Sequence, residues 1–258
     1  MPSWDPRLYL RFGRERIQPC VDLARRAADV IASPGRVIDL GCGPGNSTAV
    51  LRRTFPDAQL VGVDNSESML VQARGSGLNA TWQHADITDW MPDAPVDLLF
   101  SNAALQWVPD HAALFPRLLD CVASGGVLAV QLPYHLTSPV HRIIADVAAR
   151  FDAFDDFSDG LTVHAADRYY DWLAPHAASV AMWRTTYHHV LADADAVVAW
   201  ISGSGLRPYL EHLERSRGAD ERDAFLASYA AAIRAAYPPA ADGKVIFEFP
   251  RLFVIAVA

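Results

Sequence analysis

Short apolar runs alternate with amphipathic segments through the first half of the chain. Between residues 34 and 132 this alternation occurs five times. A short apolar run bounded by turn residues is typical of a buried strand, and apolar residues three and four apart are typical of a helix. Strands joined by helices pair in parallel with right-handed crossovers. The pattern therefore predicts an α/β fold built on an open parallel sheet.

The alternation changes after residue 132. Residues 134–161 and 193–241 have helical patterns, and two long apolar segments, 179–191 and 244–258, are expected to be strands. We therefore expect an N-terminal segment or flap, an α/β core, helical cap insertions, and a return of the chain to the core sheet. These parts are expected at residues 1–33, at 34–132, at 133–161 and 193–242, and at 162–192 and 243–258, respectively.

The N-terminal segment carries an apolar stripe near helical spacing, formed by Trp4, Leu8, Tyr9 and Phe12. Packing onto the core and closure over a ligand both explain the stripe, and the two are compatible. The segment lacks a basic start followed by an apolar stretch, so no secretion signal is expected. The longest apolar run, residues 252–258, is far shorter than the roughly 20 residues that cross a bilayer.

Charge and cysteine usage narrow the function classes. The net charge of the 258 residues is −8, and lysine occurs once, at Lys244. Nucleic-acid binding requires a basic face, so no nucleic-acid partner is expected. The three cysteines are widely spaced and suggest no disulfide framework, which fits a reducing cytoplasm. No metal-ligand spacing is found.

The most informative motif is a glycine loop within residues 37–47. An apolar run containing Asp39 leads directly into Gly41, Gly43 and Gly45, and a helical pattern follows. This order of strand, tight turn and helix N-terminus is where parallel sheets bind nucleotide-like ligands. Glycines there permit positive φ or let a ligand lie against bare main chain.

The spacing of the loop is GxGxG rather than the GxGxxG of dinucleotide enzymes. A carboxylate at Asp39 would repel a diphosphate and attract an ammonium or a sulfonium group. S-Adenosylmethionine carries both cations. The loop therefore favours S-adenosylmethionine as the cofactor over a nicotinamide dinucleotide.

Polar residues at the ends of the next three strands support this cofactor. Asp64 lies about twenty residues past the loop, where an acidic residue accepts hydrogen bonds from ribose hydroxyls. The next helix is capped by Asn65 or Ser66. Asp86 could accept the adenine amine while the ring packs on Ile87. The predicted cofactor site comprises Asp39, Gly41, Cys42, Gly43, Gly45, Asp64, Asn65, Met69, Asp86, Ile87 and Asn102.

The segments DLGCGPGNS, GVDNSESML, HADITDW, SNAALQW and GGVLAVQ resemble class I S-adenosylmethionine-dependent methyltransferases. Further segments are similar to one family of that superfamily, the trans-aconitate 2-methyltransferases: WDPRLYLRF, LQWVPDHAALFPRLL, WRTTYHHVL, GLRPYL and FPRLFVIA. The resemblance covers nearly the whole chain. It implies a Rossmann-like sheet of seven strands, mostly parallel with one antiparallel strand, plus a helical cap.

The resemblance also implies the activity: methylation of a carboxyl group of trans-aconitate, giving a monomethyl ester and S-adenosylhomocysteine. A carboxylate is already ionised at neutral pH, so we expect no general base and catalysis by positioning. The resemblance thus implies a small polycarboxylate as the substrate, and the oligomeric state is left open.

Positioning a tricarboxylate calls for several donors, and arginine binds a carboxylate bidentately. Arg207 and Arg251 are the main candidates, although Arg251 in an apolar strand is also explained by a buried partner such as Asp171 or Glu248. The predicted substrate residues are Tyr9, Gln106, Trp107, His135, Arg207, Tyr209 and Arg251.

Three alternatives stay open. A methyltransferase for another small acid or natural product would have the same loop and a different cap. A non-catalytic protein could retain the cofactor site, although intact Asp39, Asp64 and Asp86 argue against it. A nicotinamide-dependent dehydrogenase predicts GxGxxG, and binding of S-adenosylhomocysteine rather than NAD would exclude it.

Overall fold

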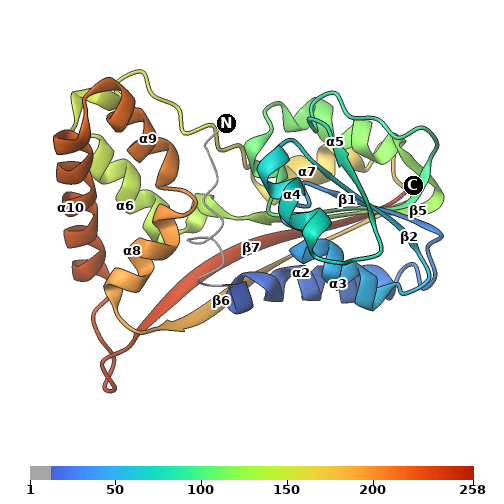
Figure 1. Cartoon of the computed structure of the whole chain (residues 1–258), viewed down its shortest axis with the longest axis horizontal. Helices are drawn as coiled ribbons and strands as arrows, with labels where there is room; N and C mark the ends of the chain where they lie inside the picture. Colours follow the sequence, from blue (N-terminus) through green and yellow to red (C-terminus); the bar gives the residue numbers. More distant parts are fainter. Residues whose placement is uncertain (1–12) are drawn as a thin grey trace. The chain divides into compact units, whose positions relative to one another are not determined.

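The computed structural model describes residues 13–258, so Tyr9 and the other residues of the N-terminal stripe lie outside the described part. The chain divides into two compact units. The first, here the core unit, contains Arg16–Pro133, Thr162–Thr185 and Arg251–Ala258. The second, here the helical unit, contains Tyr134–Leu161 and Thr186–Pro250. Figure 1 labels the elements of both.

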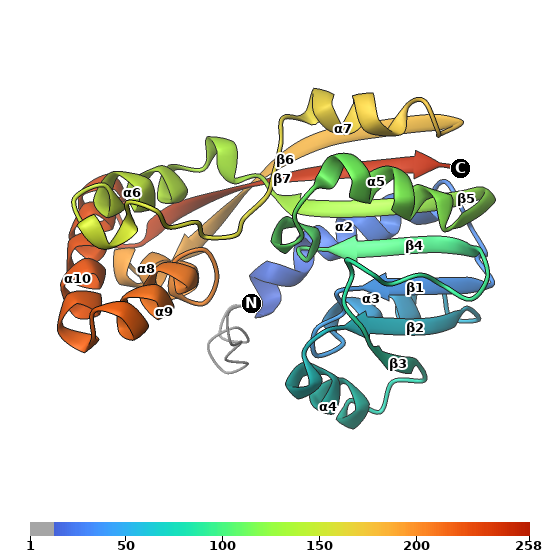
Figure 2. The same ribbon diagram turned by 90° about the horizontal axis from the view of Figure 1, so that it is seen from above.

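A seven-stranded sheet is formed in the order β3-β2-β1-β4-β5-β7-β6 (Figure 2). Adjacent pairs from β3 to β5 are parallel, whereas β5 and β7 are antiparallel, in register from Val127↔Val257 to Pro133↔Arg251. The sheet and its reversal confirm the predicted fold. The strands are β1 Arg36–Leu40, β2 Gln59–Asp64, β3 Thr81–His84, β4 Val96–Asn102, β5 Val122–Pro133, β6 Ser179–Leu191 and β7 Val245–Val257.

Helices cover both faces of the sheet in the core unit. Helices α2 Gly13–Ala28 and α3 Asn46–Thr54 lie on one face, and α5 His111–Asp120 and α7 Ala166–Leu173 on the other (Figures 1 and 2). Strands covered on both faces are apolar throughout, which explains the continuous apolar runs of the sequence. Helix α4, Glu67–Gly75, begins after Ser66, whose hydroxyl accepts a hydrogen bond from the backbone N–H of Met69 at 3.4 Å.

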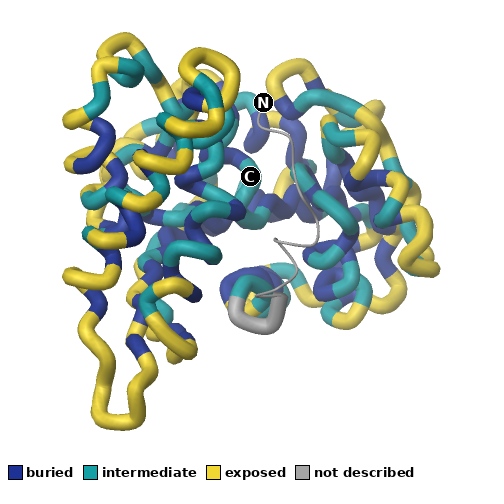
Figure 3. Tube along the Cα trace, turned by 60° about the vertical axis from the view of Figure 1, so that its left-hand side comes forward, coloured by how far each residue is buried: buried dark blue, intermediate teal, exposed yellow. Residues whose placement is uncertain are grey.

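The helical unit has its own hydrophobic core around Trp200, Phe225, Tyr229 and Phe247, all of which are fully buried. Along the trace in Figure 3, buried segments alternate with exposed turns, as amphipathic helices require. The helices of this unit are α6 Pro139–Ala148, α8 Ala194–Ser202, α9 Arg207–Ser216 and α10 Ala219–Ala236.

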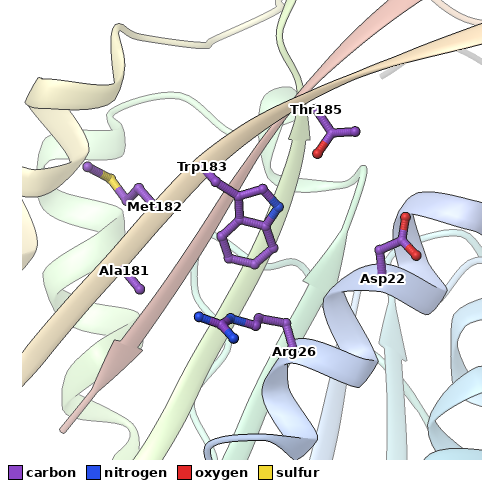
Figure 4. Close-up of a pocket in the computed structure, with 6 residues that line it drawn as sticks. All are labelled: Asp22, Arg26, Ala181, Met182, Trp183 and Thr185. Atoms are coloured by element: carbon purple, nitrogen blue, oxygen red, sulfur yellow. The ribbon is translucent and has the colours of Figure 1, made fainter.

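A groove of about 450 Å³ lies between α2 and β6 in the core unit. Figure 4 shows the indole of Trp183 in this groove, with Asp22 and Arg26 on the facing helix. The indole stacks on Phe253 of β7, with ring centroids 4.8 Å apart. Trp183 and Phe253 therefore both lie on the face of the sheet that α2 covers.

Among residues 13–258 no helix is long and apolar enough to cross a membrane. The same residues contain no cluster of three or more His, Cys, Asp or Glu side chains that could hold a metal ion. The three cysteines of the chain are free and buried.

Candidate functional site

The glycine loop follows β1 directly and is tied to β2. Gly41, Gly43 and Gly45 all have positive φ, at 78°, 54° and 91°. The backbone N–H groups of Gly41 and Cys42 both donate to the carbonyl of Val63, at 2.8 and 3.0 Å. A Cβ atom on Gly41 would lie only 2.2 Å from the Cβ of Ala104, whereas a Cβ on Gly43 would meet nothing within 4 Å. The loop thus packs tightly at Gly41 and presents an open face at Gly43.

Asp39 is fully buried beneath this loop. Its Oδ2 accepts hydrogen bonds from the hydroxyls of Ser47 at 2.7 Å and Thr48 at 2.6 Å, both in the first turn of α3. Its Oδ1 has no hydrogen-bond partner among the described residues. Burial raises the pKa of Asp39 to about 6, against the lowering effect of the two hydroxyls. A nearby cation would favour the ionised form and restore the ordinary pKa.

Asp64 ends β2 and fixes the glycine loop from the other side. Its Oδ2 accepts the backbone N–H of Gly43 at 2.8 Å, and its Oδ1 accepts the backbone N–H of Ser66 at the same distance. Burial raises the pKa of this carboxyl, partly offset by these backbone donors. Each oxygen has a second lone pair, so the carboxylate can still accept hydrogen bonds from two hydroxyls of a ligand.

Asp86 follows β3 and lies beside the end of β2. Its Oδ1 accepts both the backbone N–H and the hydroxyl of Thr88, at 2.9 and 2.7 Å, which lowers its pKa. Its Oδ2 accepts the side-chain N–H of Asn65 at 3.0 Å. The hydrogen bond from Asn65 joins the two strand ends, and the buried Ile87 provides an apolar side chain next to them.

The end of β4 forms a constrained turn. Ala103 has a φ of 54°, which is uncommon for a residue other than glycine, and its carbonyl accepts the side-chain N–H of Gln106 at 2.7 Å. A 3₁₀ helix, η1 Leu105–Trp107, follows. Gln106 is buried and Trp107 is half-buried. The turn therefore holds Gln106 beside Asn102, at the edge of the sheet where the glycine loop lies.

A buried histidine fixes this turn from below. The Nε2 of His111 contacts the carbonyl of Leu105 at 2.9 Å, and its Nδ1 contacts the hydroxyl of Tyr169 at 2.8 Å. A carbonyl only accepts, so Nε2 of His111 carries a proton, and in the neutral form Nδ1 accepts from the hydroxyl of Tyr169. Burial lowers the pKa of His111 and favours this neutral form. These two contacts tie the turn to Tyr169 of α7.

These residues fit a cofactor with a cationic end and a ribose. The free Oδ1 of Asp39, the remaining lone pairs of Asp64 and the open face at Gly43 lie along one edge of the sheet. Cys42 contributes main chain to the loop, since its thiol packs 3.0 Å from where a Cβ of Gly62 would lie. Met69 is buried in α4 behind the loop.

Comparison with known proteins places this site in a family. Residues 37–126 match a family described as a methyltransferase domain. The chain is 47% identical to the trans-aconitate 2-methyltransferase of Azoarcus sp. (strain BH72), with all of both chains covered. The chain belongs to the trans-aconitate 2-methyltransferase family.

Solved structures share the fold at much lower identity. The YcgJ protein from Bacillus subtilis aligns with a TM-score of 0.58 at 12% identity, covering 93% of this chain and 97% of that one. The plantazolicin methyltransferase BpumL, solved with S-adenosylhomocysteine, aligns with a TM-score of 0.54 at 14% identity, covering 96% and 86%. Both confirm the methyltransferase fold.

In this member of the trans-aconitate 2-methyltransferase family, the predicted substrate residues fall on both units. Gln106, Trp107 and Arg251 belong to the core unit, and His135, Arg207 and Tyr209 to the helical unit. Tyr9 lies outside the described residues. Their roles stay predictions.

Arg251 is only 5% exposed, in the part of β7 that pairs with Pro133 of β5. One of its suggested partners, Glu248, is half-exposed and contacts His188 at 3.6 Å. Arg251 lies in the middle of β7, opposite the last residue of β5, and a buried guanidinium is costly unless it is paired or binds an anion. Its position therefore keeps the substrate role open.

Two candidates of the helical unit already contact acidic side chains. The Nε of Arg207 is 2.8 Å from Oε1 of Glu211, one turn further along α9. The hydroxyl of Tyr209 donates to Asp159 at 3.3 Å, and burial raises the pKa of Tyr209. Burial also lowers the pKa of His135, which favours its neutral form.

Sequence reasoning missed three residues that shape the site. Trp82 of β3 lies beneath the loop, because Cβ atoms on Gly45 and Gly62 would lie 3.0 and 2.5 Å from its ring. Ala104 packs closely against Gly41. Gln131 is a buried glutamine within an apolar strand. Of these three residues, only Gln131 could have been detected from the sequence, because it is a polar residue that interrupts an apolar run.

Proposed function

We propose that this chain is an S-adenosylmethionine-dependent carboxyl O-methyltransferase that converts trans-aconitate into its monomethyl ester. Support for the substrate comes from full-length similarity to a named trans-aconitate 2-methyltransferase. Support for the cofactor comes from the glycine loop and its three acidic neighbours. The free, buried cysteines are in keeping with a cytoplasmic location.

One observation carries the cofactor assignment. A fully buried carboxylate, Asp39, has a free oxygen and a raised pKa directly beneath a glycine loop that is open at Gly43. A diphosphate would worsen the electrostatics of this carboxylate, and a cationic ligand would improve them. When bound, S-adenosylmethionine supplies the methyl group and is released as S-adenosylhomocysteine.

The residues of the chain act by positioning. A carboxylic acid with a pKa of about 4 is ionised at neutral pH, so no side chain has to remove a proton. Holding the acceptor oxygen in line with the methyl group could supply roughly 7–11 kcal/mol of the barrier. Opposite charges are lost as the methyl group transfers, so exclusion of water by buried side chains such as Gln106 and Ile87 favours the reaction.

The acceptor is tested by a screen of small acids. We expect methyl transfer from labelled S-adenosylmethionine to be faster with trans-aconitate than with cis-aconitate, isocitrate or citrate. The product should be an ester that is hydrolysed by mild base. Equal rates with all four acids would favour a methyltransferase for another small acid, and binding of NAD in place of S-adenosylhomocysteine would exclude the proposal.

Arg207 gives a second, independent test. Arg207→Ala should raise the KM for trans-aconitate about tenfold and leave the affinity for S-adenosylhomocysteine unchanged, because a charge-assisted hydrogen bond contributes about 1.5–3 kcal/mol. The control is Glu211→Gln, which removes the acidic partner of Arg207 and should not raise this KM. A rise with both variants would show that the ion pair itself, rather than a substrate contact, is what matters.

A further inference from the structure

Gln131 is the most unusual buried side chain of the core unit. It is 1% exposed, and neither its Nε2 nor its Oε1 has a hydrogen-bond partner among the described residues. Leaving a buried polar group without a partner costs about 1–3 kcal/mol, and this amide has both a donor and an acceptor. Such a cost near the carboxyl end of an apolar strand indicates a group that is held for a ligand.

The register of the sheet places Gln131 in a row of polar residues with Asn102 and Arg251, here the polar row. On β5 it pairs with Asn102 of β4 on one side and with Phe253 of β7 on the other. Paired residues share a face, and Phe253 stacks on Trp183 on the α2 face. The next pair on this face is Pro133↔Arg251. Asn102, Gln131 and Arg251 therefore line the same face at the carboxyl end of the sheet.

The same glutamine is linked to the turn that carries Gln106. The backbone carbonyl of Gln131 accepts the N–H of Ala103 at 2.9 Å, and the carbonyl of Ala103 accepts the side-chain N–H of Gln106. The Oε1 of Gln106, like the Oδ1 of Asn102, is buried without a partner among the described residues. Three amides with unused hydrogen-bonding atoms are thus gathered around one short turn.

We propose that Gln131 binds the acceptor, its Nε2 donating a hydrogen bond to a carboxylate. This inference rests on the proposed function and adds a residue to it. The polar row offers neutral amide donors beside one guanidinium and no acidic side chain, which suits an anion with several oxygens. Asn102 and Pro133 are only partly buried, so the row is open towards the carboxyl ends of the strands.

The variant Gln131→Met separates this role from a structural one. Methionine has a similar volume and no strong polar atom, so the variant loses an unpartnered amide and should unfold at the same or a higher temperature. The KM for the acid that accepts the methyl group should rise about tenfold. Calorimetry should give an unchanged Kd for S-adenosylhomocysteine. A purely structural glutamine would not produce this combination.

The matched control is Ser101→Ala on the opposite face of β4. The hydroxyl of Ser101 is buried and donates to the carbonyl of Leu40 at 2.8 Å. Its loss should lower the unfolding temperature and leave the KM unchanged. An unchanged KM in an active Gln131→Met, or a weakened Kd for S-adenosylhomocysteine, would overturn the proposal for Gln131 alone. A wild-type protein that methylates none of the tested acids would overturn the proposed function as well.

Discussion

Replacing Asp39 by asparagine is expected to weaken the binding of S-adenosylhomocysteine about 100-fold while making the unliganded protein more stable. The carboxylate is fully buried, and only its Oδ2 is used by Ser47 and Thr48. If this charge serves a cationic ligand, as proposed, its removal weakens binding without removing a contact that the fold needs at Oδ1. Hydrogen bonds to charged groups contribute about 1.5–3 kcal/mol, which corresponds to roughly 10- to 100-fold in affinity.

The gain in stability follows from the raised pKa. Asp39 has a pKa of about 6 in the fold and 3.8 as an ordinary carboxyl. The folded state therefore holds a proton at pH values where the unfolded state has lost it. The contribution of this carboxyl to stability is full below about pH 4 and is lost as the pH rises through about 6. The loss at pH 7 amounts to about 3 kcal/mol, and an uncharged asparagine avoids most of it.

Two measurements check this prediction. Urea unfolding at pH 5 and pH 7.5 should show a smaller loss of stability with rising pH in Asp39→Asn than in the wild type, and calorimetry should show the weaker binding. The control Asp97→Ala removes a carboxylate that accepts the backbone N–H groups of Gly35 and Arg36, both at 2.8 Å. That variant should lose stability and bind normally. An Asp39→Asn protein that binds normally would contradict the proposed role.

The sequence alone was sufficient to predict the sheet of the core unit, whereas the cofactor residues stay predictions. A strand that is covered on both faces appears in the sequence as a continuous apolar run. A backbone position with positive φ favours glycine, so a glycine loop can also be recognised in the sequence. Asp39 and Asp64 were singled out because they interrupt or end such a run, and Asp86 because it follows the next strand. The alternative between Asn65 and Ser66 as helix cap needed the structure, which identifies Ser66.

Residues whose position depends on packing or on strand register were harder to predict from the sequence. Trp82 lies in a short, partly exposed strand, and nothing in its neighbourhood distinguishes a ring beneath the glycine loop from an ordinary β-sheet aromatic. Arg207 was proposed for its chemistry, but its ion pair with Glu211 became visible only once α9 was placed. The polar row at Gln131 depends on which residues of β4, β5 and β7 pair, and a single sequence does not specify register.

Replacing Gly41 by alanine is expected to cost about 3 kcal/mol of stability, whereas the same change at Gly43 should cost about 1 kcal/mol. Both residues have positive φ, which costs an alanine about 1–2 kcal/mol. At Gly41 the new methyl group would also overlap the Cβ of Ala104, 2.2 Å away, and overpacking adds about 1–3 kcal/mol. Chemical denaturation of the two variants measures the difference directly.

The variants Gly41→Ala and Gly43→Ala also distinguish an effect on folding stability from an effect on ligand binding. The methyl group of Gly43→Ala would project into open space on the proposed cofactor face, so this stable variant should bind S-adenosylhomocysteine at least tenfold more weakly. The double variant Gly41→Ala with Ala104→Gly removes the overlapping methyl of residue 104 and should recover much of the lost stability. Failure of that recovery would show that strain at φ 78°, rather than contact with Ala104, limits the loop. Normal binding by Gly43→Ala would place the ligand away from the glycine loop.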